Sequence, residues 1–65
     1  MANTLPLTEL VSHIVRVYTT NGPIEFAAYE KQEAIILARF LYKDIQIYKV
    51  HVFDFKTEKK IFELT

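Results

Sequence analysis

The sequence contains no cysteine and only one glycine, Gly22, among its 65 residues. Without cysteine there is neither a disulfide nor a thiolate metal site, and a single glycine does not make a glycine-rich phosphate loop. No apolar run approaches the ~18 residues that a membrane-spanning helix needs, and residues 1–10 lack the basic and apolar regions of a signal peptide. We therefore expect a cytoplasmic protein with no membrane segment.

The sequence also lacks a net charge, because eight basic residues balance eight acidic ones. Sequence-independent nucleic-acid binders normally carry a positive field, since phosphate neutralisation supplies most of their affinity. The charge balance therefore disfavours nucleic acid as a partner. The chain is instead rich in apolar residues: 51% of its residues are hydrophobic and 14% are aromatic, which excludes disorder.

A chain of 65 residues forms one small domain. A domain of this size buries only ~60% of the surface that its unfolded chain exposes, and small domains usually compensate with disulfides, a metal or a partner subunit. Because cysteine is absent, we expect this domain to be unusually well packed or to self-associate. The expected partner is the chain itself, as a homodimer.

Residues 13–20 are rich in β-branched side chains and lead directly into Asn21-Gly22, the pair typical of a two-residue type I′ turn. The return strand covers residues 24–29, and this turn places Val17 opposite Phe26. One face of the hairpin is then apolar and is predicted to be core. It consists of Val15, Val17, Ile24, Phe26 and Ala28.

Apolar residues at i, i+3, i+4 and i+7 predict a helix over residues 31–43. This stripe consists of Ala34, Leu37, Ala38 and Leu41. At about 100° per residue, Ile36 and Phe40 fall on the opposite side of the helix, where an i, i+4 pair is in contact. One sheet does not cover both sides, so Ile36 and Phe40 are predicted to lie in an interface.

Residues 45–55 and 60–64 form a second predicted hairpin, with a turn near Thr57-Glu58 and Phe53 opposite Phe62. In this register the hairpin is apolar on both faces, which is unusual for an antiparallel pair with one solvated face. One of these faces combines aromatic and basic side chains with a C-terminal leucine. It carries Lys49, His51, Phe53, Phe55, Phe62 and Leu64.

Together these elements predict a single α+β domain over residues 1–65 with the order β-β-α-β-β. The fold is an antiparallel four-stranded sheet, made of two hairpins, with one central helix. Residues 1–12 precede the first strand as a short helical turn or a coil, since Pro6 is compatible with the first turn of a helix.

No set of residues specifies a chemistry. His13 and His51 are the only side chains whose ordinary pKa lies near neutrality. Neither has a metal-ligand partner or a nucleophile at a motif spacing, so both are predicted to be partly exposed strand residues. Asp54 and Glu63 are predicted neighbours, which suggests acid–base work, but the lysines around them favour a salt-bridged rim. We expect no catalytic, metal or cofactor site, and no enzyme.

The sheet leaves one alternative open. Aromatic rings beside basic residues stack bases on RNA-binding sheets. Here that group comprises Tyr18, Tyr29, Phe53, Phe55 and Phe62 with Arg16 and Lys49. Core packing and a dimer face compete with this interpretation, and the nearby Glu25, Asp54 and Glu63 repel phosphate.

A resemblance to a known family runs from Phe26-Ala27-Ala28-Tyr29 through Glu33-Ala34, Leu37-Ala38 and Tyr42 to Tyr48-Lys49-Val50-His51-Val52. This pattern resembles the small podophage proteins that inhibit the host's RNA polymerase. The resemblance implies a phage-type binding protein in which Lys49 and His51 take the place of basic residues that contact the polymerase. The chain departs from the family in having lysine and histidine where arginines are expected, a second C-terminal strand, and no acidic excess.

We therefore interpret the chain as a non-enzymatic protein-binding module. Its partners are expected to be a second copy and a larger host protein, and nucleic acid is the alternative. The predicted interface has a desolvated centre and a polar rim. The centre is Ile36, Phe40, Phe53, Phe55 and Phe62; the rim is Arg39, Lys43, Lys49 and His51.

Overall fold

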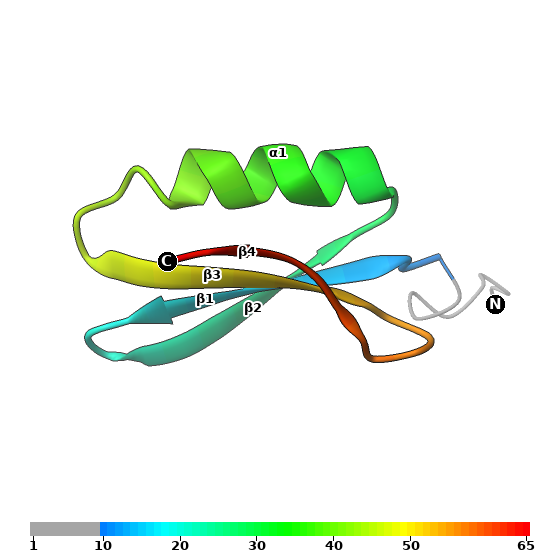
Figure 1. Ribbon diagram of the computed structural model, residues 1–65, viewed down its shortest axis with the longest axis horizontal. Coiled ribbons are helices and arrows are strands. Elements are labelled where there is room, and N and C mark those ends of the chain that lie inside the picture. Colours follow the sequence, from blue (N-terminus) through cyan, green and yellow to red (C-terminus); the bar gives the residue numbers. More distant parts are fainter. Residues whose placement is uncertain (1–9) are drawn as a thin grey trace, which may run out of the picture.

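The computed structural model describes residues 10–65, and the expected coil or helical turn lies mostly outside this range. The predicted α+β fold is confirmed: four antiparallel strands and one helix follow each other in the order β-β-α-β-β (Figure 1). The elements are β1 (His13–Thr19), β2 (Gly22–Ala28), α1 (Lys31–Leu41), β3 (Ile47–Asp54) and β4 (Lys60–Leu64). The helix ends two residues before the predicted limit, and Tyr42 forms its C-cap.

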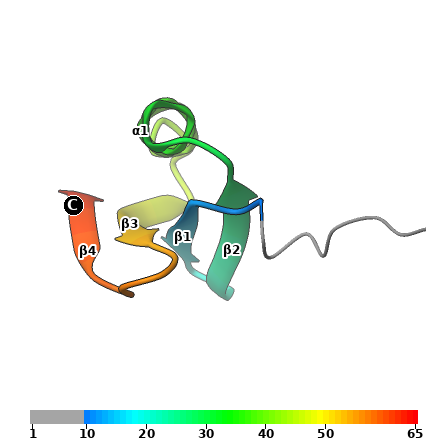
Figure 2. The same cartoon turned by 90° about the vertical axis from the view of Figure 1, so that its right-hand side faces the viewer.

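The strands lie side by side in the order β2-β1-β3-β4. The two hairpins therefore join through the central pair β1 and β3, which is antiparallel. Helix α1 crosses one face of the sheet and packs mainly over this central pair (Figure 2). Strands β2 and β4 are left as the two edges.

The core lies between α1 and the central strands. Four valines from β1 and β3 are almost fully buried, together with three alanines. Because Ala34 and Ala38 have small side chains and are fully buried, α1 lies close to the sheet. The fully buried set is Val15, Val17, Ala28, Ala34, Ala38, Val50 and Val52.

The first hairpin turns one residue earlier than predicted. Thr19 pairs with Gly22, and Val17 pairs with Ile24 instead of Phe26. Gly22 has φ +111°, whereas Asn21 does not have a positive φ, so the type I′ assignment was wrong. The Thr19 hydroxyl accepts the Asn21 N–H at 3.0 Å and donates to the Gly22 carbonyl at 2.9 Å. The pairing moves by two residues, so each side chain keeps its predicted face.

The second hairpin differs from the prediction by one residue, which changes the faces. Val52 pairs with Phe62, and an irregularity between Val52 and Phe53 shifts the register along the hairpin. Phe62 and Leu64 therefore lie on the α1 side, packed against the core. The predicted face that grouped Phe62 with Phe53 was wrong.

The loop between β3 and β4 explains this shift. The carboxylate of Asp54 accepts the backbone N–H groups of Lys56 and Thr57 at 2.9 and 3.0 Å. Glu58 has φ +62°, and its N–H donates to the Asp54 carbonyl at 2.8 Å. The chain thus reverses through a capped loop over residues 55–59, which is longer than the predicted turn.

Candidate functional site

The nine predicted interface residues do not form one surface. Four belong to α1 or the turn after it: Ile36, Arg39, Phe40 and Lys43. Three belong to the face of β3 away from α1, and Phe55 follows in the loop: Lys49, His51, Phe53 and Phe55. Phe62 packs on the α1 side, as part of the core. The structure therefore separates the predicted site into a helix surface and an open sheet face.

The helix surface is exposed as expected. Ile36 is 58% exposed and Phe40 is 68% exposed, so both point away from the sheet. With Leu37 they line a shallow hollow on the outside of α1 that is bordered by Glu30 and Glu33. No side chain of the sheet lines this hollow in the described part of the chain.

The two flanks of α1 face different edges of the sheet. The guanidinium of Arg39 lies 5.4 Å from the ring of Phe62, so that flank faces β4. The carboxylate of Glu33 accepts the backbone N–H of Tyr29 at 2.8 Å, directly after β2. Residues three or four apart share a helix flank. Leu37 and Phe40 therefore lie on the same flank of α1 as Glu33, which is the flank toward β2.

Strand β2 extends beyond the cover that α1 provides. Ile24 is 49% exposed and Phe26 is 38% exposed, although both lie on the α1 side of the sheet. Their predicted face was right and their predicted burial was wrong. We call Ile24, Phe26, Ile36 and Phe40 the α1–β2 surface. It presents four large apolar side chains on one side of a small domain.

The open face of the sheet is aromatic, but two of its rings already form cation–π contacts with basic side chains of the same face. The Arg16 guanidinium lies 4.8 Å from the Phe53 ring, and the Lys49 ammonium lies 4.7 Å from the Tyr18 ring. The His51 ring lies edge-on between Tyr18 and Phe53, at 5.1 and 5.7 Å between centroids. Internal cation–π contacts therefore occupy faces that a base would need for stacking.

Acidic side chains border the same face. A hollow beside Phe53 and Phe55 is lined by Arg16 and by three carboxylates. Those carboxylates belong to Glu25, Asp54 and Glu58. Arg16 forms an ion pair with Glu25 at 2.6 Å. The pKa of Arg16 is raised by the nearby Tyr18 and then by this carboxylate. These carboxylates would repel a phosphate in the hollow.

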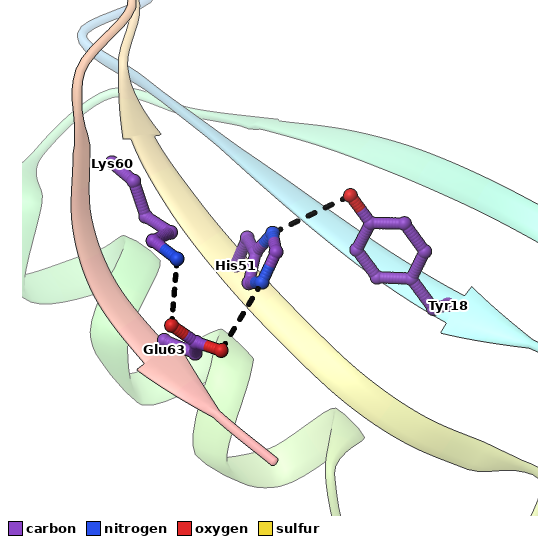
Figure 3. Close-up of polar contacts among 4 residues, drawn as sticks. All are labelled: Tyr18, His51, Lys60 and Glu63. Carbon is purple, nitrogen blue, oxygen red and sulfur yellow. Dashed lines mark hydrogen bonds and ion pairs between the residues drawn. The ribbon is translucent and has the colours of Figure 1, made fainter.

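His51 lies between Tyr18 and Glu63 on the open face (Figure 3), and its side chain is 13% exposed. Its Nδ1 lies 3.4 Å from the Tyr18 hydroxyl. Its Nε2 lies 3.5 Å from the Glu63 carboxylate, and this nitrogen is buried with no hydrogen-bond partner among residues 10–65. Burial lowers the pKa of His51 first and the charge of Lys60 lowers it further, against the raising effect of Glu63. Sequence reasoning missed this pair because the true register alone brings Glu63 opposite His51.

Asp54 and Glu63, which the sequence predicts to be neighbours, bind different groups. Glu63 binds Lys60 at 2.7 Å, while Asp54 caps its own loop, so they do not form an acid–base pair. A hydrogen bond from Lys60 lowers the pKa of Glu63, and a backbone hydrogen bond from Thr57 lowers that of Asp54. Both groups are therefore ionised at neutral pH.

His13 is buried, with 8% exposure, where the sequence predicted partial exposure. Its Nδ1 lies 2.6 Å from the Ser12 hydroxyl. Over residues 10–65 no carboxylate forms a hydrogen bond with this ring, so the pair lacks the third group that orients the base of a serine nucleophile. Within the same residues no three potential ligands gather around a metal position.

No helix in the described part of the chain is long and apolar enough to cross a membrane. Compared with protein-family models, curated proteins and solved structures, the chain matches none of them.

Proposed function

We propose that this chain is a non-enzymatic protein-binding module of the cytoplasm that self-associates as a homodimer. The observation that carries the proposal is the α1–β2 surface, on which Ile36 and Phe40 are more than half exposed. Ile36, Leu37 and Phe40 line one hollow on α1, and an exposed apolar patch on a small domain is typical of interaction sites. Covering one such side chain stabilises a complex by roughly 1.5–3 kcal/mol when burial is complete.

The surroundings of this surface support a protein partner. Glu33 and Arg39 border the apolar pair on opposite flanks of α1, and Lys43 follows the helix. A polar rim around an apolar centre is the usual composition of a protein interface. The core is made of small side chains, since its largest fully buried residues are valines. Because a small core stabilises a single chain only modestly, it favours association with a second copy.

The resemblance to phage-type polymerase inhibitors extends the proposal to a larger host protein as a second partner. In that extension Lys49 and His51 supply polar contacts from the open face. The two partners would then use opposite sides of the sheet. A nucleic-acid role for the open face is the weaker candidate, because its cations already lie over Tyr18 and Phe53.

Mass measurements test the proposal. Light scattering and sedimentation equilibrium at micromolar concentration should give twice the 7.6 kDa mass of one chain. Ile36→Asp with Phe40→Asp should remain folded by circular dichroism and should lose self-association. Ile45→Asp with Tyr48→Asp is the matched control, since both residues are exposed apolar side chains outside the α1–β2 surface. A single-chain mass for the natural sequence at high concentration contradicts the proposed homodimer.

The host-protein extension needs a purified partner. A protein captured from the native host counts only if the purified protein binds the natural chain directly. Its affinity must fall when Lys49 and His51 are replaced together by alanine, while Ile45→Asp leaves it unchanged. Binding that survives the Lys49 and His51 replacement contradicts the extension.

A further inference from the structure

The two edge strands of the sheet, β2 and β4, differ in how well they are protected against pairing with a strand of another chain. Strand β4 is short, with a register irregularity opposite it, and it carries Lys60 and Glu63, which bind each other. Charges and irregularities of this kind hinder pairing with another strand. Strand β2 has seven residues and one charge, Glu25, which Arg16 already neutralises at 2.6 Å. Its outward side also contains Pro23, which hinders pairing at that end of the strand, so β2 is the less protected edge over residues 24–28.

Within residues 10–65, the backbone groups of β2 that have no partner strand can be identified. The carbonyl of Ala28 accepts the Ser12 N–H at 2.9 Å, so it points toward β1. Backbone groups alternate in direction along an antiparallel strand, so those of Glu25 and Ala27 point away from β1. Pro23 also lies in this outward set, but it has no N–H to donate. Edge β2 thus offers two complete donor–acceptor positions.

We propose that two copies of the chain pair antiparallel through β2, about a twofold axis at Phe26, and form a continuous eight-stranded sheet. This proposal rests on the self-association proposed above and assigns its contact. The register places Glu25 opposite Ala27 of the second copy, and the reverse. Each of these two pairs exchanges two backbone hydrogen bonds, so all of the outward groups of Glu25 and Ala27 are used.

Neighbouring registers are less favourable. A twofold axis at Glu25 places two carboxylates directly opposite each other, and it aligns Ala27 with Pro23, which has no donor. An axis at Ala27 aligns Glu25 with Tyr29, which lies beyond the end of β2. The axis at Phe26 avoids both problems.

The apolar side chains of β2 support the same register. On the α1 side, the two Phe26 rings meet at the axis, and Ile24 lies opposite Ala28 of the second copy. A stable dimer buries about 800 Å² of each partner, which is about a sixth of the 4731 Å² surface of this chain. In this arrangement the exposed side chains of Ile24 and Phe26 would contribute to that area.

Cysteine cross-linking tests the register, because the natural chain has no thiol. Phe26→Cys places two sulfurs across a non-hydrogen-bonded pair, whose Cα separation of about 4.5 Å suits a disulfide. Ile24→Cys is the matched control on the same face. In the proposed register its two copies stand about 13 Å apart along the strands. Mild oxidation should cross-link Phe26→Cys at least tenfold faster than Ile24→Cys.

A second variant tests the backbone pairing without a thiol. Ala27→Pro removes an outward N–H and leaves the bonds to β1 intact, whereas Ala27→Val keeps the donor. We expect Ala27→Pro to raise the dimer dissociation constant at least tenfold, with unchanged circular dichroism, and Ala27→Val to have a much smaller effect. If the natural chain is a dimer by mass but Phe26→Cys does not cross-link and Ala27→Pro still dimerises, this inference is wrong and self-association stands. A monomeric natural chain overturns both.

Discussion

The imidazole of His51 lies 3.5 Å from the carboxylate of Glu63, and in the described part of the chain its buried Nε2 has no hydrogen-bond partner. Burial and the nearby Lys60 favour the neutral ring, so the pKa of His51 falls below its ordinary value of 6.5. The unfolded chain therefore binds a proton at a higher pH than the folded chain does. This difference links the stability of the fold to pH.

The free energy of unfolding should decrease as the pH falls from 7 through 6.5 and then level off once the folded ring is also protonated. Urea denaturation at constant protein concentration between pH 5 and pH 8 measures this change. His51→Gln should reduce the slope. Glu63→Gln should steepen it, because Glu63 raises the pKa of His51. An unchanged slope in His51→Gln would show that another group causes the pH dependence.

Gly22→Val should destabilise the chain by about 1–3 kcal/mol, because a β-branched residue is strained at φ +111°. Apart from its chain neighbours, a Cβ at this position meets no atom of the described residues within 4 Å, so the expected cost is backbone strain. Gly22→Asn should therefore cost less, since asparagine tolerates positive φ. Asn21→Ala should change stability by well under 1 kcal/mol, whereas the type I′ turn predicted from the sequence would make it costlier. Thermal melts of the three variants distinguish the observed turn, in which Thr19 pairs with Gly22, from a type I′ turn at Asn21-Gly22.

Ala38→Leu should destabilise the fold by roughly 1–3 kcal/mol, because the fully buried alanine leaves no room between α1 and the sheet. Leu37→Asp should unfold the chain. Ile36→Ala with Phe40→Ala should stay within about 0.5 kcal/mol per site at concentrations where the chain is monomeric. Chemical denaturation measures all three. A large loss in the last variant would place Ile36 and Phe40 in the core.

Single-stranded RNA should show no measurable binding even at low ionic strength, because phosphate contacts would meet the carboxylates beside Arg16. Fluorescence anisotropy with a labelled oligonucleotide measures this directly. Binding that weakens steeply with added salt would revive the nucleic-acid alternative. Lys49→Ala would then identify the open face as its site.

The helix was predicted well because its signal is local. The 3.6-residue period alone places Ala34 and Ala38 inward and Ile36 and Phe40 outward, and the structure has them so. The faces of β1 and β2 were also predicted, because side chains alternate along any strand. A shift of two residues in the first hairpin left those faces unchanged.

The remaining errors concern non-local geometry. Phe62 changed faces because the Asp54 loop and the irregularity after Val52 shift the register by an odd number of residues. Ile24 and Phe26 were assigned to the core because alternation predicts a side of the sheet and not how far a helix covers it. The His51–Glu63 pair was missed for the same reason as Phe62. Long-range packing, and not local preference, decides these positions.

The charged edge at β4 also limits how far an assembly through β2 would grow. Pairing of two β2 strands about a twofold axis uses both of the less protected edges at once, and each end of the eight-stranded sheet is then a β4 strand. Lys60 and Glu63 lie on those ends, where an added strand would have to displace their ion pair. Such an assembly is closed at two chains, and the same apolar strand that joins them does not seed a fibril.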